Sequence, residues 1–278
     1  HTRLFLNGEP LFHMGLLDQG WWPDGLYTAP TDAALKYDLE VTKKLGYNML
    51  RKHVKVEPQR FYYWADRLGV LVWQDMPSGD MQPGEIPGRT PESAAQFKEE
   101  YKAVIDALDH YPSIVMWVPF NEGWGQFRTR EIVEWTEDYD PTRLVNNASG
   151  WHDRGVGDVV DEHHYPGPGM PAPEENRAAV LGEFGGEALV VEDHLWIQDF
   201  SEAPTHYETS RSEEALHTTY DRMIQEVDSM KAEGLAAAVY TQTTDVESEV
   251  NGVMTYDRAV IKFDPAHMRE MHRALIKE

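Results

Sequence analysis

Short apolar runs alternate with longer amphipathic runs along the whole chain. The short runs have the length of buried strands, and the longer runs repeat their apolar residues at the spacing of one helix face. Strands and helices in alternation predict a parallel α/β protein, and eight strands is the number of a (β/α)8 TIM barrel. The eight predicted strands are 11–16, 47–51, 70–74, 114–119, 144–147, 158–163, 179–182 and 236–240.

Helices are predicted in the gaps between these strands, with none between the fifth and the sixth. Asp32 after Thr31 and Pro265 after Asp264 are typical helix starts, because Thr and Asp side chains accept from free amides and proline fits the first turn. The predicted helices are 32–45, 58–68, 92–109, 129–139, 212–233 and 265–277.

The first residues, RLFLNGEPLFHMG, place Asn7-Gly8 between two apolar stretches. This pair favours a tight turn, so a hairpin is predicted near 3–13, where we expect it to plug the bottom of the barrel. A length of 278 residues is normal for one barrel, and residues 1–278 are therefore predicted to form a single catalytic domain. The start at His1 suggests a mature or excised segment, and upstream domains are compatible with it.

Charge and composition narrow the class of partner. The chain has 48 acidic and 25 basic residues, a net charge of -23, which argues against nucleic acid or an anionic membrane surface as a partner. No apolar run reaches the length of about 18 residues expected of a membrane span. Without cysteines there is no thiolate chemistry, and no cofactor is expected. A neutral carbohydrate fits this composition, a homo-oligomer is compatible with it, and periplasmic, secreted and cytoplasmic locations stay open.

Two glutamates carry the most specific chemical signal. Glu122 in WVPFNEGWG follows the fourth predicted strand, and Glu183 in VLGEFGG follows the seventh. Residues that end the strands of one parallel barrel share its C-terminal face, so both carboxylates are expected in one cavity. Cleavage of a glycosidic bond needs such a pair, one group to protonate the leaving oxygen and one to meet the positive charge on the sugar carbon. Asn121 beside Glu122 can orient a hydroxyl, and Trp124 can stack on a sugar ring.

The sequence HYPSIVMWVPFNE, residues 110–122, resembles the acid/base signature of glycoside hydrolase family 2, within the clan A barrels. The resemblance is to the catalytic barrel of the β-galactosidase and β-glucuronidase type. It extends through FLNGEPL, NMLRKH, LVWQDMP, EFG, YTQTTDVE and NGVMTYDR. It implies a retaining β-glycosidase with Glu122 as acid/base, Asn121 bonding the sugar 2-hydroxyl and Glu183 as nucleophile.

Further binding residues are expected where other strands end. Arg51 and His53 share one side of the second strand, and an arginine near Glu183 would keep that carboxylate ionised. His163 and Tyr165 share parity and are expected in the pocket, Tyr165 bonding the nucleophile by resemblance, whereas His164 is expected to pack between barrel and helix. The remaining candidates for contacts with the sugar are Asp18, Asp75, Trp151 and Gln242, together with Trp124.

Two other functions are compatible with parts of the sequence. A metal-dependent hydrolase could use His53, Asp75, His163 and His164, but neither an HExxH motif nor a His-x-His pair in the first strand supports it, and no metal site is predicted. A carbohydrate-binding barrel, or an inactive catalytic fragment without accessory domains, is the main alternative. The sugar, its linkage and exo or endo action stay open. A uronic acid would ask for a cation, for which Lys52, Lys55 and Arg154 are candidates.

Overall fold

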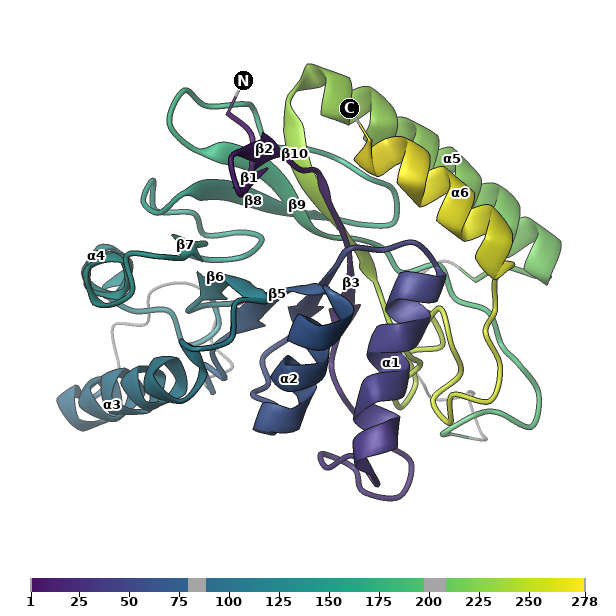
Figure 1. The fold of residues 1–278 in the computed structure, drawn as a ribbon, viewed down its shortest axis with the longest axis horizontal. Helices are drawn as coiled ribbons and strands as arrows, with labels where there is room; N and C mark the ends of the chain where they lie inside the picture. Colours follow the sequence, from purple (N-terminus) through teal and green to yellow (C-terminus); the bar gives the residue numbers. More distant parts are fainter. Residues whose placement is uncertain (1, 80–88, 198–208, 278) are drawn as a thin grey trace.

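The computed structural model describes residues 2–79, 89–197 and 209–277. Eight parallel strands form one sheet in the order β7-β6-β5-β4-β3-β10-β9-β8 (Figure 1). The predicted TIM barrel is confirmed, and each strand lies at its predicted place with shifted ends. The strands are β3 (His13–Asp18), β4 (Met49–Lys52), β5 (Leu71–Asp75), β6 (Ile114–Val118), β7 (Leu144–Val145), β8 (Val159–His164), β9 (Ala178–Gly185) and β10 (Leu235–Thr241).

The barrel is nearly closed between β7 and β8. These two strands are not laddered, but an isolated bridge joins Asn146 to Gly157. Asp158 also accepts from the Val145 amide with Oδ2, at 2.7 Å. These contacts hold the first and last strands of the sheet together, so all eight strand ends surround one mouth.

The described residues form six helices around the strands, and all six were predicted. Thr31, Thr90 and Ser212 cap α1, α3 and α5 by accepting from an amide in the first turn, while Gly69 ends α2 in the left-handed conformation at φ 67°. No helix lies in 146–158 or 165–177, so two strand connections are loops. The helices are α1 (Asp32–Lys44), α2 (Gln59–Leu68), α3 (Pro91–Leu108), α4 (Thr129–Tyr139), α5 (Glu213–Glu233) and α6 (Pro265–Ile276).

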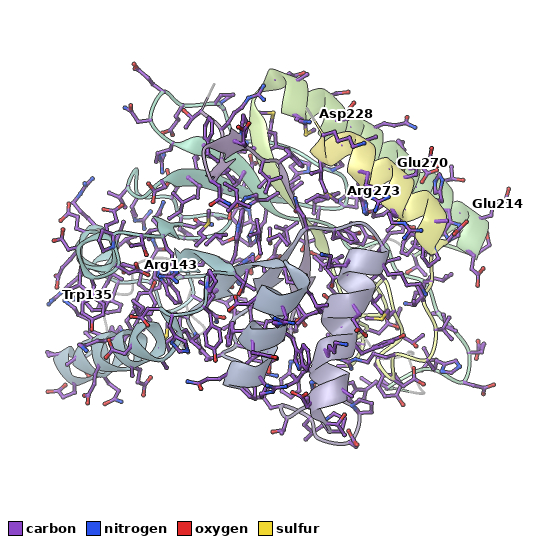
Figure 2. All side chains as sticks on the ribbon, in the orientation of Figure 1. Trp135, Arg143, Glu214, Asp228, Glu270 and Arg273 are labelled. Carbon is purple, nitrogen blue, oxygen red and sulfur yellow. The ribbon has the colours of Figure 1, made fainter. Side chains whose placement is uncertain are left out.

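The outer faces of the helices are polar. Figure 2 shows Glu214 and Asp228 on α5, and Glu270 and Arg273 on α6, along the outside of the molecule, and all four side chains are exposed. Among the described helices, none combines the length and the apolar composition needed to cross a membrane.

The N-terminal hairpin consists of β1 (Phe5–Leu6) and β2 (Glu9–Pro10), paired antiparallel. Its turn residues Asn7 and Gly8 both have positive φ, 54° and 85°, which is the conformation of a type I′ turn. The hairpin itself is exposed at Phe5, but Leu4 is buried and packs on the apolar interior of the barrel. Leu4, rather than the paired residues of the hairpin, thus packs against the apolar interior of the barrel.

The barrel interior is apolar below and charged above. The apolar part consists of side chains such as Leu17, Met49, Trp73, Met116, Val180 and Val239, which form one cluster with Leu4. Further along the same strands, Arg51, Asp75 and Glu183 take the inward positions, and all three are buried. The C-terminal ends of the strands therefore carry the functional side chains, as in other barrels of this kind.

Candidate active site

The two predicted glutamates meet at the C-terminal mouth of the barrel. Glu183 lies in β9, and Glu122 lies four residues after the end of β6. One carboxylate oxygen of each lies within 4.8 Å of the other and of a ring nitrogen of His163. They share a cavity of about 490 Å³, which is lined by Leu17, Gln19, His53, Asn121, Glu122, Trp124, Trp151, Tyr165, Glu183, Thr241 and Glu249.

A tight turn presents Glu122. Its φ of 51° is left-handed, a conformation that is uncommon for a residue with a side chain. Neighbouring hydrogen bonds hold this turn: the Glu122 amide donates to the Ser149 carbonyl at 2.8 Å, and the Trp124 amide donates to the Asn121 carbonyl at 2.8 Å. The side chain of Glu122 keeps 16% of its surface exposed, so its carboxylate reaches the cavity.

Arg51, which is fully buried, organises the floor of the site. Its Nη1 donates to Glu183 Oε1 at 3.0 Å, and its Nε and Nη2 form a bidentate pair with Asp75 at 3.1 and 2.8 Å. Nη2 also donates to Asn121 Oδ1 at 2.7 Å, so the amide NH2 of Asn121 is the group that can bond a ligand. One guanidinium therefore fixes both the nucleophile candidate and the hydroxyl-binding candidate.

Glu183 is surrounded by donors. The Tyr165 hydroxyl donates to Oε2 at 2.7 Å, and His53 Nε2 lies 3.6 Å from Oε1. Burial raises the pKa of Glu183, the positive charges of His163 and Arg51 counteract this, and the negative Glu122 adds to the rise, so the net shift is upward. The ionised form that a nucleophile needs thus depends on the cations around it.

His163 lies between the two carboxylates. Its Nδ1 is 3.0 Å from Glu122 Oε1 and 3.4 Å from Glu183 Oε2, while Nε2 is 2.8 Å from Ser149 Oγ. The Ser149 hydroxyl in turn donates to Asp161 at 2.6 Å. Burial lowers the pKa of His163, but the neighbouring carboxylates outweigh it and the net shift is upward, which favours the charged ring.

Some predicted sugar contacts do not line the cavity. Asp18 accepts from Lys52 Nζ and from the Gly20 amide, both at 2.9 Å, on the outer side of the sheet. The reason is register: β3 continues to Asp18, so Leu17 faces the cavity and Asp18 faces the opposite side. Asp75 is held by Arg51, and Gln242 is buried against Glu249 and Asn251; these two act behind the cavity wall.

Of the predicted aromatic and histidine residues, some line the cavity and His164 does not. Trp124 and Trp151 line the cavity, and Trp151 is 51% exposed with its ring 5.7 Å from that of His163. The prediction for His164 is wrong, because this side chain is exposed and its Nδ1 lies 2.8 Å from the Gly167 carbonyl. His163, one residue earlier, takes the inward position.

Besides Leu17, three cavity residues were not singled out from the sequence. Gln19 follows β3, Thr241 ends β10, and Glu249 lies in the loop after β10. Gln19 lies two residues after Leu17 and so faces the same side of the strand. Extending the predicted strand beyond residue 16 would have placed Gln19 in the cavity. Glu249 lies eight residues beyond Thr241, and nothing local distinguishes it from the other acids of the chain.

A metal site fits this geometry poorly. Glu122, His163 and Glu183 offer three ligand atoms close enough for an ion. Of the other predicted ligands, His164 is exposed and Asp75 is paired with Arg51. His53 lines the cavity with Nε2 3.6 Å from Glu183 Oε1, but it does not belong to this group of ligand atoms. Arg51 already places a positive charge 3.0 Å from Glu183, where it would repel a metal cation.

Comparison with known proteins gives one consistent family. Residues 4–175 match the family described as "Glycosyl hydrolases family 2, TIM barrel domain". A β-galactosidase of Vibrio cholerae is 24% identical over 221 residues, covering 72% of this chain and 21% of the relative. Beta-mannosidase B of Aspergillus fumigatus is 33% identical over 122 residues, covering 41% of this chain and 14% of the relative. The chain spans about a fifth of the length of the β-galactosidase.

A solved structure has the same fold. The β-galacturonidase from Eisenbergiella tayi, bound to galacturonate, superimposes with a TM-score of 0.74 at 19% identity. The superposition covers 98% of this chain and 53% of that protein. At this identity the likeness concerns the fold, and the chemistry has to be argued from the side chains described above.

Proposed function

This chain belongs to glycosyl hydrolase family 2, and from that premise we propose that it is a retaining glycosidase with Glu183 as nucleophile and Glu122 as acid/base. The observation that carries the proposal is the approach of the two carboxylates to within 4.8 Å in one cavity. Retaining enzymes hold the carboxyl groups about 5 to 5.5 Å apart, whereas inverting enzymes need about 6.5 to 9.5 Å to admit a water. The relatives are named β-galactosidase, β-glucuronidase and β-mannosidase, so the proposed substrate is a β-linked glycoside.

In the first step a carboxylate oxygen of Glu183 attacks the anomeric carbon. The bond from that carbon to the leaving oxygen breaks, and its electron pair goes to the oxygen, which takes the proton of Glu122. The products are a covalent glycosyl ester on Glu183, an alcohol and ionised Glu122. Arg51, at 3.0 Å from Glu183, keeps the nucleophile ionised before the attack.

In the second step Glu122 removes a proton from water, whose oxygen attacks the same anomeric carbon. The ester bond breaks and returns the electron pair to Glu183, so the sugar leaves with its original configuration. His163, 3.0 Å from Glu122 and 3.4 Å from Glu183, interacts with both carboxylates as their charges change between the steps. We assign it as a positioning residue.

The sugar would be held by groups with distinct roles. The NH2 of Asn121 is the proposed donor to the 2-hydroxyl, because its Oδ1 is occupied by Arg51. Tyr165 donates to Glu183 Oε2 at 2.7 Å and orients the oxygen pair for attack. Trp124 and the half-exposed Trp151 offer faces for the sugar ring or the leaving group.

Product stereochemistry tests the proposal. The enzyme is incubated with a 4-nitrophenyl β-glycoside in an NMR tube, and the first anomer released is identified before it mutarotates. The β anomer is expected, and the α anomer would overturn the retaining mechanism. Binding without nitrophenol release would favour a carbohydrate-binding barrel. Loss of activity with EDTA, restored by zinc, would favour the metal hydrolase instead.

A further inference from the structure

One wall of the cavity carries an acidic residue that the two-glutamate mechanism does not use. Glu249, from the loop after β10, lines the same cavity as Glu122 and Glu183. Its Oε2 accepts from Gln242 Nε2 at 2.6 Å and from Gln19 Nε2 at 3.3 Å. Because both donors use Oε2, Oε1 has no side-chain partner in the described part of the chain and can accept from a ligand hydroxyl.

Gln19 and Gln242 hold the Glu249 carboxylate in place. Gln19 Nε2 donates to Gln242 Oε1 at 3.0 Å, and Gln242 Nε2 donates to Asn251 Oδ1 at 2.9 Å. Gln242 is 1% exposed, so the support of Glu249 is buried while the carboxylate itself reaches the cavity. An acceptor held in this way selects ligands by their hydrogen-bond donors.

The described lining of the cavity has no fixed cation that could bind a carboxylate group of a ligand. Among its described lining residues there is neither Lys nor Arg, and segments 80–88 and 198–208 contain neither in the sequence. Burial lowers the pKa of His53 far below its usual value, with the charge of Arg51 adding to the effect, which keeps this lining residue neutral. Arg51 is itself engaged below the cavity by Asp75, Glu183 and Asn121.

The cations suggested by the sequence for a uronic acid lie elsewhere. Lys52 binds Asp18 at 2.9 Å and Glu57 at 2.6 Å on the outer side of the sheet. Lys55 binds Glu57 at 2.9 Å and the Gly20 carbonyl at 2.5 Å. Neither lysine lines the cavity, and nor does Arg154.

The acidic groups already repel one another. Burial raises the pKa of Glu249 to about 7, and the negative charge of Glu183 adds to the rise against the hydrogen bonds from Gln242 and Gln19. A ligand carboxylate would bring one more negative charge into this cavity. Like charges disfavour binding in a site whose cations, Arg51 and His163, are already engaged by Glu183.

We propose that Glu249, supported by Gln19 and Gln242, is a specificity-determining residue that accepts a hydroxyl of a neutral sugar and excludes uronic acids. This inference rests on the proposed glycosidase function and names its substrate class as neutral β-glycosides. Glu249 takes no part in bond cleavage, so it affects which sugar binds and how tightly.

Matched substrate pairs test the inference. The wild-type protein is assayed above pH 7, where Glu249 is ionised despite its raised pKa, with 4-nitrophenyl β-D-galactopyranoside against the β-D-galacturonide, and with the β-D-glucopyranoside against the β-D-glucuronide. Members of a pair differ only at C6, which is a CH2OH group in the neutral sugar and a carboxylate in the uronide. We expect kcat/KM of the neutral member to exceed that of the uronide by about 100-fold in the pair that is hydrolysed. Preference for a uronide would overturn the inference while leaving the glycosidase function intact.

A variant of Glu249 tests whether this side chain causes the selectivity. Glu249→Gln keeps the size of the group and removes its charge, and is expected to shrink the neutral-to-uronide ratio by about tenfold or more. Glu131→Gln, at an exposed position of α4 outside the cavity lining, is the control and should leave the ratio unchanged. An unchanged ratio in Glu249→Gln would overturn the role of this residue.

The selectivity can also be tested if the protein hydrolyses none of these substrates. If none of the four substrates were hydrolysed, the proposed function would fail for galactosides and glucosides, and the selectivity would still be testable by binding. Saturation-transfer NMR with galactose and galacturonate then measures the selectivity on the same proteins. Binding of galactose alone supports the inference, and binding of galacturonate, or of neither sugar, overturns it.

Discussion

Arg51 and Lys52 are consecutive residues of β4, both buried, and each binds two carboxylates, yet they build different kinds of site. Arg51 faces the inside of the barrel and binds Asp75 and Glu183. Lys52 faces the outside and binds Asp18 and Glu57. The alternation of side chains along one strand thus separates two buried ionic clusters by the thickness of the sheet.

The two clusters differ in whether a ligand can reach them. Around Lys52, Glu57 also binds Lys55, Asp18 also accepts from the Gly20 amide, and the ring of Phe61 lies 4.8 Å from Nζ. In the Arg51 cluster, Glu183 borders the cavity. A closed ion cluster acts only within the fold, whereas an open one presents a buried charge to the cavity.

The shifts in pKa follow this difference. Burial alone would raise the pKa of Asp18, but Lys52 outweighs it and the net shift is downward. For Glu183 burial prevails, and the net shift is upward. The closed cluster stabilises its carboxylate charge, and the open cluster holds a carboxylate whose charge is less stable and therefore better suited to attack carbon.

Removal of the proton donor should give the largest loss of turnover. Glu122→Gln cannot protonate a leaving oxygen, so kcat on a substrate with a poorly acidic alcohol is expected to fall by about 10² to 10⁴. With 2,4-dinitrophenolate, which leaves without a proton, the first step should be nearly normal, and azide should restore turnover by replacing the activated water. Equal losses on both substrates would argue against the acid/base role. Glu131→Gln, exposed on α4, is the control.

Changing the guanidinium should give the next largest effect. A lysine lacks the planar fork of donors with which Arg51 binds Glu183, Asp75 and Asn121, so Arg51→Lys is expected to lower kcat by about 10². Circular dichroism checks that the protein tested is folded. A variant with wild-type kcat would show that the Arg51 cluster is structural, like its neighbour, and would remove the main distinction between the two.

Lowering the pH should distinguish the two clusters without any mutation, because activity should be lost before the fold is destabilised. Glu183, with its pKa raised above 4.5, takes up a proton first, and activity falls as the pH falls through that raised value. Because the folded state binds this proton more tightly than the unfolded chain, its uptake does not destabilise the fold. Asp18 has a depressed pKa, so its stabilisation is present above 3.8 and is lost as the pH falls through the lower folded value.

The measurement compares kcat, which excludes the effect of Glu249 on binding, and the melting temperature over the same pH range. Activity should disappear on the acid side while the melting temperature is still close to its neutral value. Loss of both at one pH would show that activity reports unfolding, and the assignment of the acid limb to Glu183 would then fail.

Disrupting the closed cluster should have the smallest effect on turnover. Lys52→Met leaves Asp18 and Glu57 with fewer positive partners, and is expected to lower the free energy of unfolding by about 3 kcal/mol. The kcat of the folded protein, measured well below its melting temperature, should equal that of the wild type. A fall in kcat similar to that of Arg51→Lys would mean that the outer cluster also positions the site.

Much of this arrangement could be predicted from local pattern. Apolar runs and capping residues such as Thr31 and Asp264 indicated every strand and helix, since those signals depend on a few neighbouring residues. The pairing of Tyr165 with the Glu183 carboxylate was implied by family resemblance, and the structure shows that contact at 2.7 Å.

Other features depend on register and on distant loops. Asp18 was placed in the pocket because its strand was predicted to end two residues early, and one residue decides which side of a sheet a side chain faces. His164 was expected to pack inside but is exposed. Glu249 reaches the cavity through a loop whose path is set by tertiary contacts, such as the hydrogen bond from Gln242, so no local pattern marked it.

Trapping the covalent intermediate tests the central claim most directly. A 2,4-dinitrophenyl 2-deoxy-2-fluoro-β-glycoside of the preferred sugar reacts through its good leaving group, while the fluorine slows hydrolysis of the resulting ester. Peptide mass spectrometry then locates the sugar. The mechanism predicts one label per chain, on Glu183, and none in Glu183→Gln; a label on Glu122 or Glu249, or turnover without any covalent adduct, would contradict it.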